Sequence, residues 1–133
     1  MGLGSGVFSE EVEVIINLTQ HEATPEQVRE GVVETRNKEE VRKLLTFEEL
    51  PTTEEIFRRA RRLAEIALYE GAEAAMIGGA PYLMGPLEQE LRGVGVIPVY
   101  SFTERRVVEE SQPDGTVRKV AVFRHQGFVE GAL

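Results

Sequence analysis

The chain has 133 residues, of which 41% are hydrophobic and 29% are charged, and this size and composition indicate one folded domain with its own core. It contains no cysteine and only two histidines, which excludes disulfides, a thiolate metal site and a cysteine nucleophile; we expect neither metal nor cofactor. The formal net charge of −8 argues against binding to duplex DNA, and no apolar run approaches the ~20 residues of a membrane span. We therefore expect a cytoplasmic protein without a membrane or duplex DNA partner.

The N-terminal part of the chain divides into a leader and a first strand. Residues 1–11 are rich in glycine, and we expect a flexible leader or an expression remnant there, followed by a single α/β domain over residues 12–133. Residues 12–18 are β-branched and almost continuously apolar, which is typical of a strand covered on both faces.

Three helices are predicted after this strand. Thr24 stands before a proline, with Gln27 at the capping-box position, and this pattern predicts a helix from there to about Glu34. Residues 37–50 contain a second, shorter helical stretch. The third helix has the strongest pattern, because a capping box at residues 52–55 precedes a wide apolar stripe that runs to a natural C-terminal glycine, Gly71.

The remaining elements alternate between strands and a helix. Residues 74–77 form a short apolar strand that runs into a glycine pair and then a helix ending near Gly93. Residues 96–100 form a third strand. Finally, residues 105–110 and 116–124 flank a Gln-Pro-Asp-Gly turn signal and should form an antiparallel hairpin.

This order of elements predicts a Rossmann-like α/β domain with a short parallel sheet, helices on both faces and a C-terminal antiparallel hairpin. In such sheets ligands bind outside the carboxyl ends of the strands. We therefore expect the function to lie in three segments: residues 17–21, 78–82 and 101–106.

The first of these segments carries a polar cluster of Asn17, Thr19 and His21. An imidazole titrates near physiological pH, so His21 is a candidate general base, and Asn17 and Thr19 are candidate ligand contacts. The alternative is that Thr19 and His21 only form the turn and cap before the next helix.

The second segment begins with Gly78 and Gly79 at a strand-to-helix junction, where backbone amides can approach a phosphate. Tyr82 follows and is a candidate for stacking on a base. A plain tight turn and an aromatic side chain that simply packs are the alternatives, because the sequence is neither a Walker motif nor a three-glycine fingerprint.

The third segment places Ser101, Thr103 and Arg105 after the last strand of the parallel core. Arginine is the preferred side chain for bidentate phosphate contacts, so Arg105 is a candidate for holding a phosphate. The alternative is a surface ion pair with a neighbouring glutamate. The same two interpretations apply to the basic side chains of the second hairpin strand, Lys119, Arg124 and His125.

Two stretches resemble a known family. Residues 15–27 (IINLTQHEATPEQ) resemble the strand, histidine and helix start of small stand-alone CRISPR-associated proteins related to the ring nucleases of type III systems. A C-terminal pattern spread over residues 98–106, 109–110, 114–119 and 122–128 resembles that of one such subfamily. Together they cover under half of the chain. The resemblance implies a Rossmann-like homodimer that binds cyclic oligoadenylate in a two-fold cradle and cleaves it without metal, in antiviral defence.

The leading functional hypothesis is thus a metal-independent phosphodiesterase in which a ribose 2′-hydroxyl attacks the adjacent phosphate. Candidate catalytic residues are His21, Arg105 and Ser101, and candidate ligand-binding residues are Asn17, Thr19, Gly78, Gly79, Tyr82, Thr103 and Lys119. The expected partners are a small cyclic oligonucleotide and a second copy of the chain. Two alternatives stay open: a non-catalytic nucleotide-binding sensor, and an acidic protein-interaction module.

Overall fold

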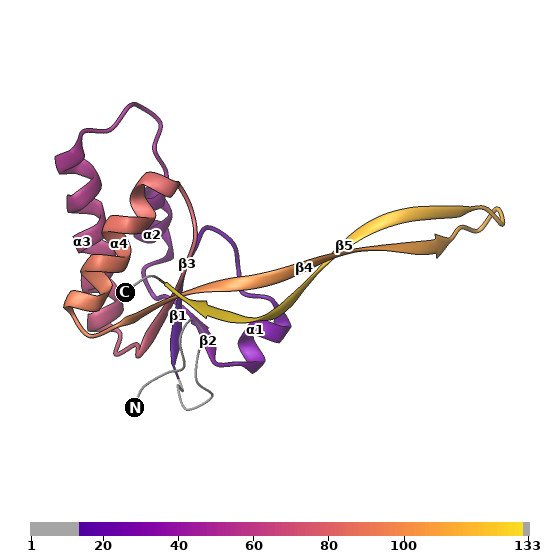
Figure 1. The fold of residues 1–133 in the computed structure, drawn as a ribbon, viewed down its shortest axis with the longest axis horizontal. Coiled ribbons are helices and arrows are strands. Elements are labelled where there is room, and N and C mark those ends of the chain that lie inside the picture. The colour runs from indigo at the N-terminus through magenta and orange to yellow at the C-terminus, as the bar shows by residue number, and fades with distance from the viewer. Residues whose placement is uncertain (1–13, 132–133) are drawn as a thin grey trace.

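The computed structural model describes residues 14–131, so the expected leader at residues 1–11 lies outside the described residues. The elements in chain order are β1 (Ile15–Leu18), α1 (Pro25–Arg29), β2 (Val32–Glu34), α2 (Lys38–Leu45), α3 (Thr53–Tyr69), β3 (Ala74–Ile77), α4 (Pro81–Gly93), β4 (Ile97–Ser111) and β5 (Val117–Glu130). Figure 1 shows a body of helices and short strands, from which β4 and β5 project together. We call the projecting part, residues 104–124, the ribbon.

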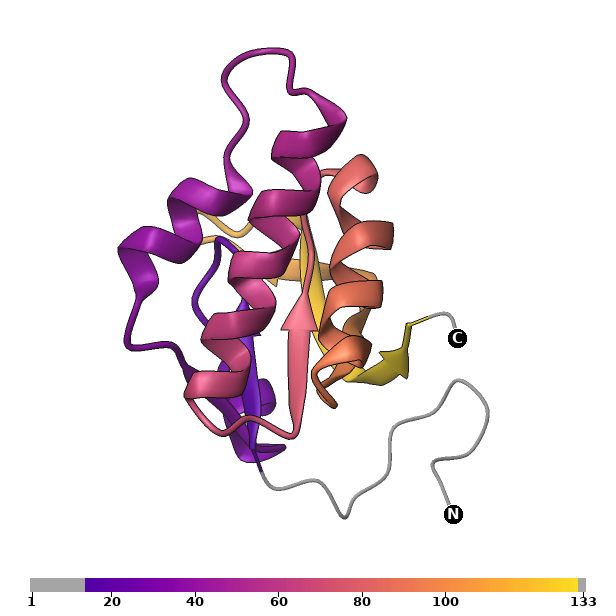
Figure 2. The ribbon, with the colours of Figure 1, turned by 90° about the vertical axis from the view of Figure 1, so that its left-hand side faces the viewer.

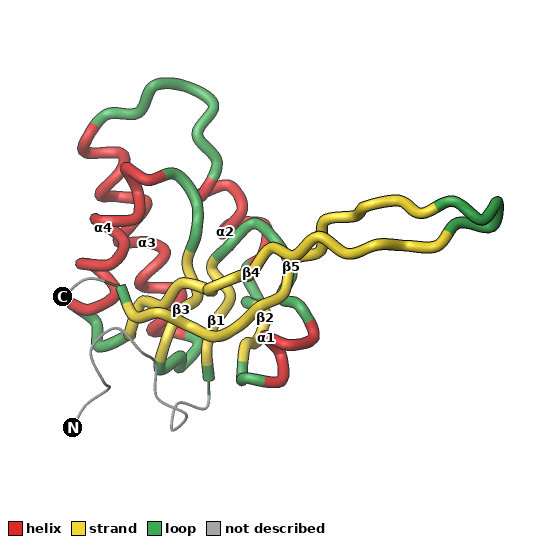
Figure 3. Tube along the Cα trace, turned by 45° about the vertical axis from the view of Figure 1, so that its right-hand side comes forward, coloured by secondary structure: helices red, strands yellow, loops and turns green. Residues whose placement is uncertain are grey.

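The strands form one five-stranded sheet in the order β2-β1-β3-β4-β5. The first four strands are parallel, and β5 is antiparallel to β4. The prediction of a mostly parallel sheet followed by antiparallel C-terminal strands is therefore confirmed. Figure 3 shows that both long strands run continuously from the sheet into the ribbon.

The two faces of the sheet are covered unequally. Side chains alternate along a strand, so Ile16 and Leu18 of β1 point to one face and Ile15 to the other. The first face packs against α2, α3 and α4, which lie side by side over it (Figure 2). The opposite face carries a smaller apolar cluster and the short helix α1.

The strongest predicted helix is confirmed as α3. The Thr52 hydroxyl accepts a hydrogen bond from the Glu55 amide at 3.1 Å, and Gly71 adopts a φ of 72° just after the helix, as a C-terminal glycine does. No helix within residues 14–131 is long and apolar enough to cross a membrane.

The prediction of one helix from Thr24 to about Glu34 is wrong. The helix α1 ends at Arg29, and residues 32–34 form the edge strand β2. Gly31 separates the two elements with a φ of 108°, a backbone angle that residues other than glycine rarely adopt. The β-branched residues that follow pair with β1, so strand pairing outweighs the helical pattern there.

The third strand and the first hairpin strand were predicted as separate elements, and this division is wrong. The structure has one strand, β4, over both segments. No glycine, proline or turn pattern interrupts residues 100–110, so nothing ends the strand. The irregularity in this strand pair lies in β5, where Gln126 forms a bulge opposite Phe102 and Thr103.

Candidate functional site

A cleft of about 430 Å³ opens at the carboxyl ends of β1 and β3, beside residues 100–103 of β4, which lie just beyond its pairing with β3. The chain passes from β1 to β2 on one side and returns to β3 on the other side of β1, so the strand order reverses between β1 and β3. Such a reversal is where open α/β sheets bind ligands. The cleft is lined by Thr19, Gln20, His21, Glu22, Thr24, Gln27, Met76, Ile77, Gly78, Gly79, Tyr100, Ser101 and Thr103.

The cleft brings together six of the ten candidate catalytic and ligand-binding residues. They come from all three predicted segments, and they are Thr19, His21, Gly78, Gly79, Ser101 and Thr103. Their side chains and backbone offer hydroxyls, one imidazole and a glycine turn. This set can donate and accept hydrogen bonds to a polar ligand and can move a proton.

The loop after β1 is held by Asn17, which is 2% exposed. Its Oδ1 accepts from the amide and the hydroxyl of Thr19 at 3.0 and 2.7 Å, and its Nδ2 donates to the His21 carbonyl oxygen at 2.7 Å and to Glu34 Oε1 at 3.1 Å. Asn17 therefore fixes the backbone that presents Thr19 and His21. The expected polar cluster is present, but Asn17 lies beneath the loop and is not among the residues lining the cleft.

The glycine turn after β3 allows a close backbone approach. Gly79 has a φ of 149°, a conformation that strains other residues, and a Cβ on Gly78 would lie 3.7 Å from Thr19 Cγ2. The helix α4 then begins at Pro81, and its N-cap residue, Ala80, makes no side-chain capping bond. Pro81 has no amide hydrogen, and the Leu83 amide donates to the Ala80 carbonyl oxygen at 3.0 Å, so the backbone itself satisfies part of this first turn.

A chain of side-chain hydrogen bonds runs from the cleft to α1. Ser101 Oγ lies 2.6 Å from Nδ1 of His125, and Nε2 of the same ring lies 2.7 Å from Glu30 Oε1. Gln27 Nε2 donates to Ser101 Oγ at 3.1 Å, and Thr103 Oγ1 lies 3.4 Å from Ser101 Oγ. The chain joins β4, β5 and α1, so it also docks α1 against the sheet.

Tyr100 forms part of the cleft wall, and its hydroxyl is bound to the helix α4. Its hydroxyl donates to Glu88 Oε2 of α4 at 2.5 Å. Burial first, and then this carboxylate, raise the pKa of the Tyr100 hydroxyl well above its usual value. The phenol therefore stays protonated and serves as a fixed hydrogen-bond donor to α4.

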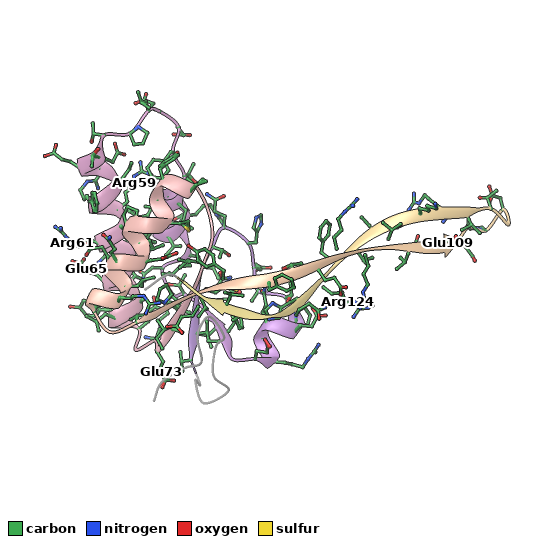
Figure 4. All side chains as sticks on the ribbon, viewed as in Figure 1. Arg59, Arg61, Glu65, Glu73, Glu109 and Arg124 are labelled. Carbon is green, nitrogen blue, oxygen red and sulfur yellow. The ribbon has the colours of Figure 1, made fainter. Side chains whose placement is uncertain are left out.

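Three of the predicted site residues lie elsewhere. Tyr82 packs its ring edge against Phe47, with ring centroids 5.2 Å apart, beside a different pocket. Arg105 and Lys119 lie on the ribbon, paired in register with Phe123 and Glu109, and neither lines the cleft. Figure 4 shows Glu109, the register partner of Lys119, far out along the ribbon.

The structure adds residues that the sequence did not single out. A smaller cavity of about 60 Å³ shares Thr19, Gln20, His21 and Glu22 with the cleft, and Lys38 and Arg42 of α2 line it. These two side chains bring positive charge next to the loop that follows β1. Among residues 14–131, no group of three or more histidine and acidic side chains is arranged to hold a metal ion.

His125 and Glu30 were not predicted as partners because 95 residues separate them. Their meeting depends on the β5 bulge. Ser101 pairs with Phe128, and an unbroken register would place His125 opposite Glu104, on the other face of the sheet. The extra residue, Gln126, shifts His125 opposite Thr103 and so onto the face of Ser101.

Comparison with known proteins gives one match. A family model described as the uncharacterized protein MJ1673 family matches residues 13–129. No curated protein matches the chain. No solved structure matches it either.

Proposed function

The chain belongs to the uncharacterized protein MJ1673 family, and we propose that it is a metal-independent phosphodiesterase that cleaves a cyclic oligoadenylate in the cleft. The observation that carries the proposal is the gathering of Thr19, His21, Gly78, Gly79, Ser101 and Thr103 in one cleft at the reversal of strand order. A Rossmann-like arrangement of the domain is part of the proposal. So is the role in type III CRISPR antiviral defence, which rests on the resemblance of the two sequence stretches.

The ligand phosphate is held mainly by neutral groups. The Gly78 and Gly79 backbone supplies amide donors, and this glycine turn lies just before the N-terminus of α4, which favours negative charge. The Thr103 hydroxyl adds a donor from β4, whereas the Thr19 hydroxyl already donates its proton to Asn17 Oδ1 at 2.7 Å and fixes the loop. Positive charge comes from Lys38 in the adjoining cavity, although Lys38 also lies 3.8 Å from Glu22.

The reaction needs only groups that RNA and this cleft contain. The ribose 2′-oxygen attacks the adjacent phosphorus and forms a new P–O bond, while the bond to the 5′-oxygen of the next nucleotide breaks. The products are a 2′,3′-cyclic phosphate end and a 5′-hydroxyl end, so a ring becomes a linear chain. The attacking 2′-hydroxyl gives up its proton to a basic group of the cleft or to water. His21, exposed at the cleft, protonates the leaving 5′-oxygen, and the amide donors stabilise the charge on the phosphoryl oxygens.

A homodimer is part of this proposal, because a symmetric cyclic ligand is best held by a symmetric site. Light scattering should then show twice the 14.8 kDa mass of the chain. A monomer at high concentration, with and without ligand, would rule out the two-fold cradle.

The direct test incubates the purified protein with cyclic oligoadenylates in EDTA and separates the products by chromatography. We expect linear products from the wild type and a decrease on the order of 10²-fold or more for His21→Ala, since proton transfer contributes about that factor. Glu109→Ala, far out on the ribbon, is the control and should be unaffected. No turnover at micromolar enzyme would end the nuclease proposal; tight binding of intact ligand would leave a non-catalytic sensor.

Arg105→Ala in the same assay separates the cleft from the ribbon. Arg105 does not line the cleft of its own chain, so we expect its loss to leave turnover nearly unchanged. A decrease of tenfold or more would show that the ribbon reaches the ligand.

A second candidate function, a protein-interaction module, is favoured by one observation. The ribbon exposes apolar side chains, with Val107, Val117 and Phe123 each more than half exposed. A two-stranded ribbon has little stability by itself in water, so such side chains suit a protein partner. Phe123→Ser would weaken capture of that partner while leaving nucleotide affinity unchanged.

A further inference from the structure

The hydrogen-bond chain of Ser101, His125 and Glu30 has a defined direction. Gln27 is the capping-box residue of α1, and its Oε1 accepts from the Thr24 amide at 2.9 Å. Its other amide atom, Nε2, can therefore only donate, and it donates to Ser101 Oγ. Ser101 Oγ thus accepts from Gln27 and keeps its own proton for another acceptor.

The acceptor is Nδ1 of His125. Glu30 is an acceptor when ionised, so Nε2 carries the ring proton and donates it to Glu30 Oε1 at 2.7 Å. In the neutral ring Nδ1 is then left as an acceptor, 2.6 Å from Ser101 Oγ. A hydroxyl, an imidazole acceptor and a carboxylate in series are the arrangement that activates a serine.

Burial and access also fit this arrangement. The His125 side chain is only 2% exposed, whereas Glu30 is 41% exposed at the far end of the chain. The ring is also held by Phe128, with ring centroids 4.7 Å apart. Ser101 lines the cleft, so the imidazole is shielded from water while the hydroxyl it faces can meet a ligand.

We propose that Ser101, His125 and Glu30 form a proton relay that makes the Ser101 hydroxyl the base of the cleft. Ser101 Oγ takes the proton from an attacking hydroxyl of the ligand and passes its own proton to Nδ1 of His125. Glu30 stabilises the imidazolium that forms, and Gln27 stabilises the developing charge on Oγ. The use of the relay on a ribose hydroxyl rests on the proposed function; the activation of Ser101 does not. Ser101 is the catalytic residue, and His125 and Glu30 are positioning residues.

The bulge in β5 makes the relay a specific feature of this fold. If Gln126 paired regularly with Thr103 instead of bulging out, His125 would lie opposite Glu104 and its ring on the opposite face from Ser101. Bulges often re-aim side chains next to active sites. The competing account is that the same bonds only dock α1 against β4 and β5.

The reactivity of Ser101 toward diisopropyl fluorophosphate distinguishes the two accounts without any natural ligand. In that reaction Oγ forms a bond to phosphorus, fluoride leaves, and the serine proton passes to His125. Peptide mass spectrometry should find the label on Ser101 and not on Ser111, an exposed serine at the other end of β4 that serves as an internal control. A purely docking role predicts that both serines are equally inert.

Variants then test the relay itself. His125→Phe keeps a ring against Phe128 but removes both nitrogens, and should lower the labelling rate by about 10²-fold or more. Glu30→Gln should lower it by a smaller factor. If His125→Phe does not fold, Glu30→Gln carries the test, because Glu30 is partly exposed. Unchanged labelling in a folded variant would overturn the relay.

The outcomes separate this inference from the proposed function. Labelling of Ser101 without cleavage of cyclic oligoadenylates leaves the relay in place and removes the phosphodiesterase. Cleavage by a wild-type protein whose Ser101 is no more reactive than Ser111 overturns the relay alone.

Discussion

The two faces of the sheet are built by different physical means. On the α3 and α4 face, fully buried leucines from the helices pack against β1 and β3, among them Leu63, Leu83, Leu87 and Leu91. On the other face lies α1, a helix of five residues; Gln27 donates a hydrogen bond to Ser101 of β4, and Glu30, which follows the helix, accepts one from His125 of β5. Apolar contact is strong but not directional, whereas these hydrogen bonds fix atoms in place.

This difference separates stability from function. The large apolar face supplies most of the free energy of folding, because burial of apolar area dominates stability. The α1 face contributes little area but sets the positions of Ser101 and His125 beside the cleft. Substitutions in the core of the α3 and α4 face should therefore destabilise the whole fold. Substitutions on the α1 face should mainly displace Ser101 and His125.

The largest stability effect is expected for Leu63→Ala, in the centre of α3. Leu63 is fully buried, so its loss leaves a cavity and should lower the free energy of unfolding by about 2–5 kcal/mol in urea denaturation. Leu68→Ala, on the same helix but 52% exposed, is the matched control and should cost much less. Equal losses for the two variants would contradict the account of this face.

A smaller effect is expected for Gln27→Ala on the α1 face. The variant loses the capping bond to the Thr24 amide and the bond to Ser101, and should lower the free energy of unfolding by about 1–2 kcal/mol. Val28→Ala, at an exposed position of α1, is the control. The labelling of Ser101 should fall in Gln27→Ala and not in Val28→Ala; a fall in both would mean that the site depends on α1 only as a whole.

The smallest effect is expected for Glu40→Gln, at an ion pair on the surface between α2 and α3. Arg62 donates to both Glu40 oxygens, at 2.6 and 3.0 Å, and this bond lowers the pKa of Glu40 below its usual 4.5. A lowered pKa in the folded state adds stability above pH ~4.5, which is lost as the pH falls through the lowered value. At pH 7 the free energy of unfolding of the wild type should be slightly higher than that of the variant, and this difference should disappear in acid.

Urea denaturation between pH 7 and pH 3 measures that gap. Glu39→Gln, next to it in α2 and exposed, is the control and should show no such gap. A gap that persists unchanged in acid would assign the stability to something other than the ion pair.

The body of the fold could be predicted from the sequence where one local signal dominates. The capping pattern and apolar stripe predicted α3, and the turn signal before Gly115 predicted the hairpin. The errors occurred where a distant partner decides the structure. Residues 32–34 become a strand because β1 pairs with them, and β4 stays continuous because β5 accompanies it along its length.

For the site, too, local signals predicted positions correctly and contacts with distant partners were missed. Thr19, His21 and the glycine pair could be placed together because the ends of parallel strands meet at one edge. Arg105 was expected at that edge, but the unbroken strand carries it onto the ribbon. His125 and Glu30 could not be joined to Ser101, because their contact depends on a one-residue bulge that the sequence pattern does not reveal.

The most direct test of the central claim, that the cleft is the ligand site, is calorimetric titration of Gly78→Ala with cyclic oligoadenylates. Gly78 has no positive φ, and an added Cβ would make ordinary contact with Thr19, so the variant should fold normally while its methyl group obstructs the backbone approach. Gly85→Ala, also on an unstrained glycine and with nothing within 4 Å, is the control. The account predicts wild-type affinity for Gly85→Ala and about a tenfold or greater loss for Gly78→Ala, as expected when a charge-assisted amide contact is broken. Equal affinity of Gly78→Ala and the wild type would contradict it.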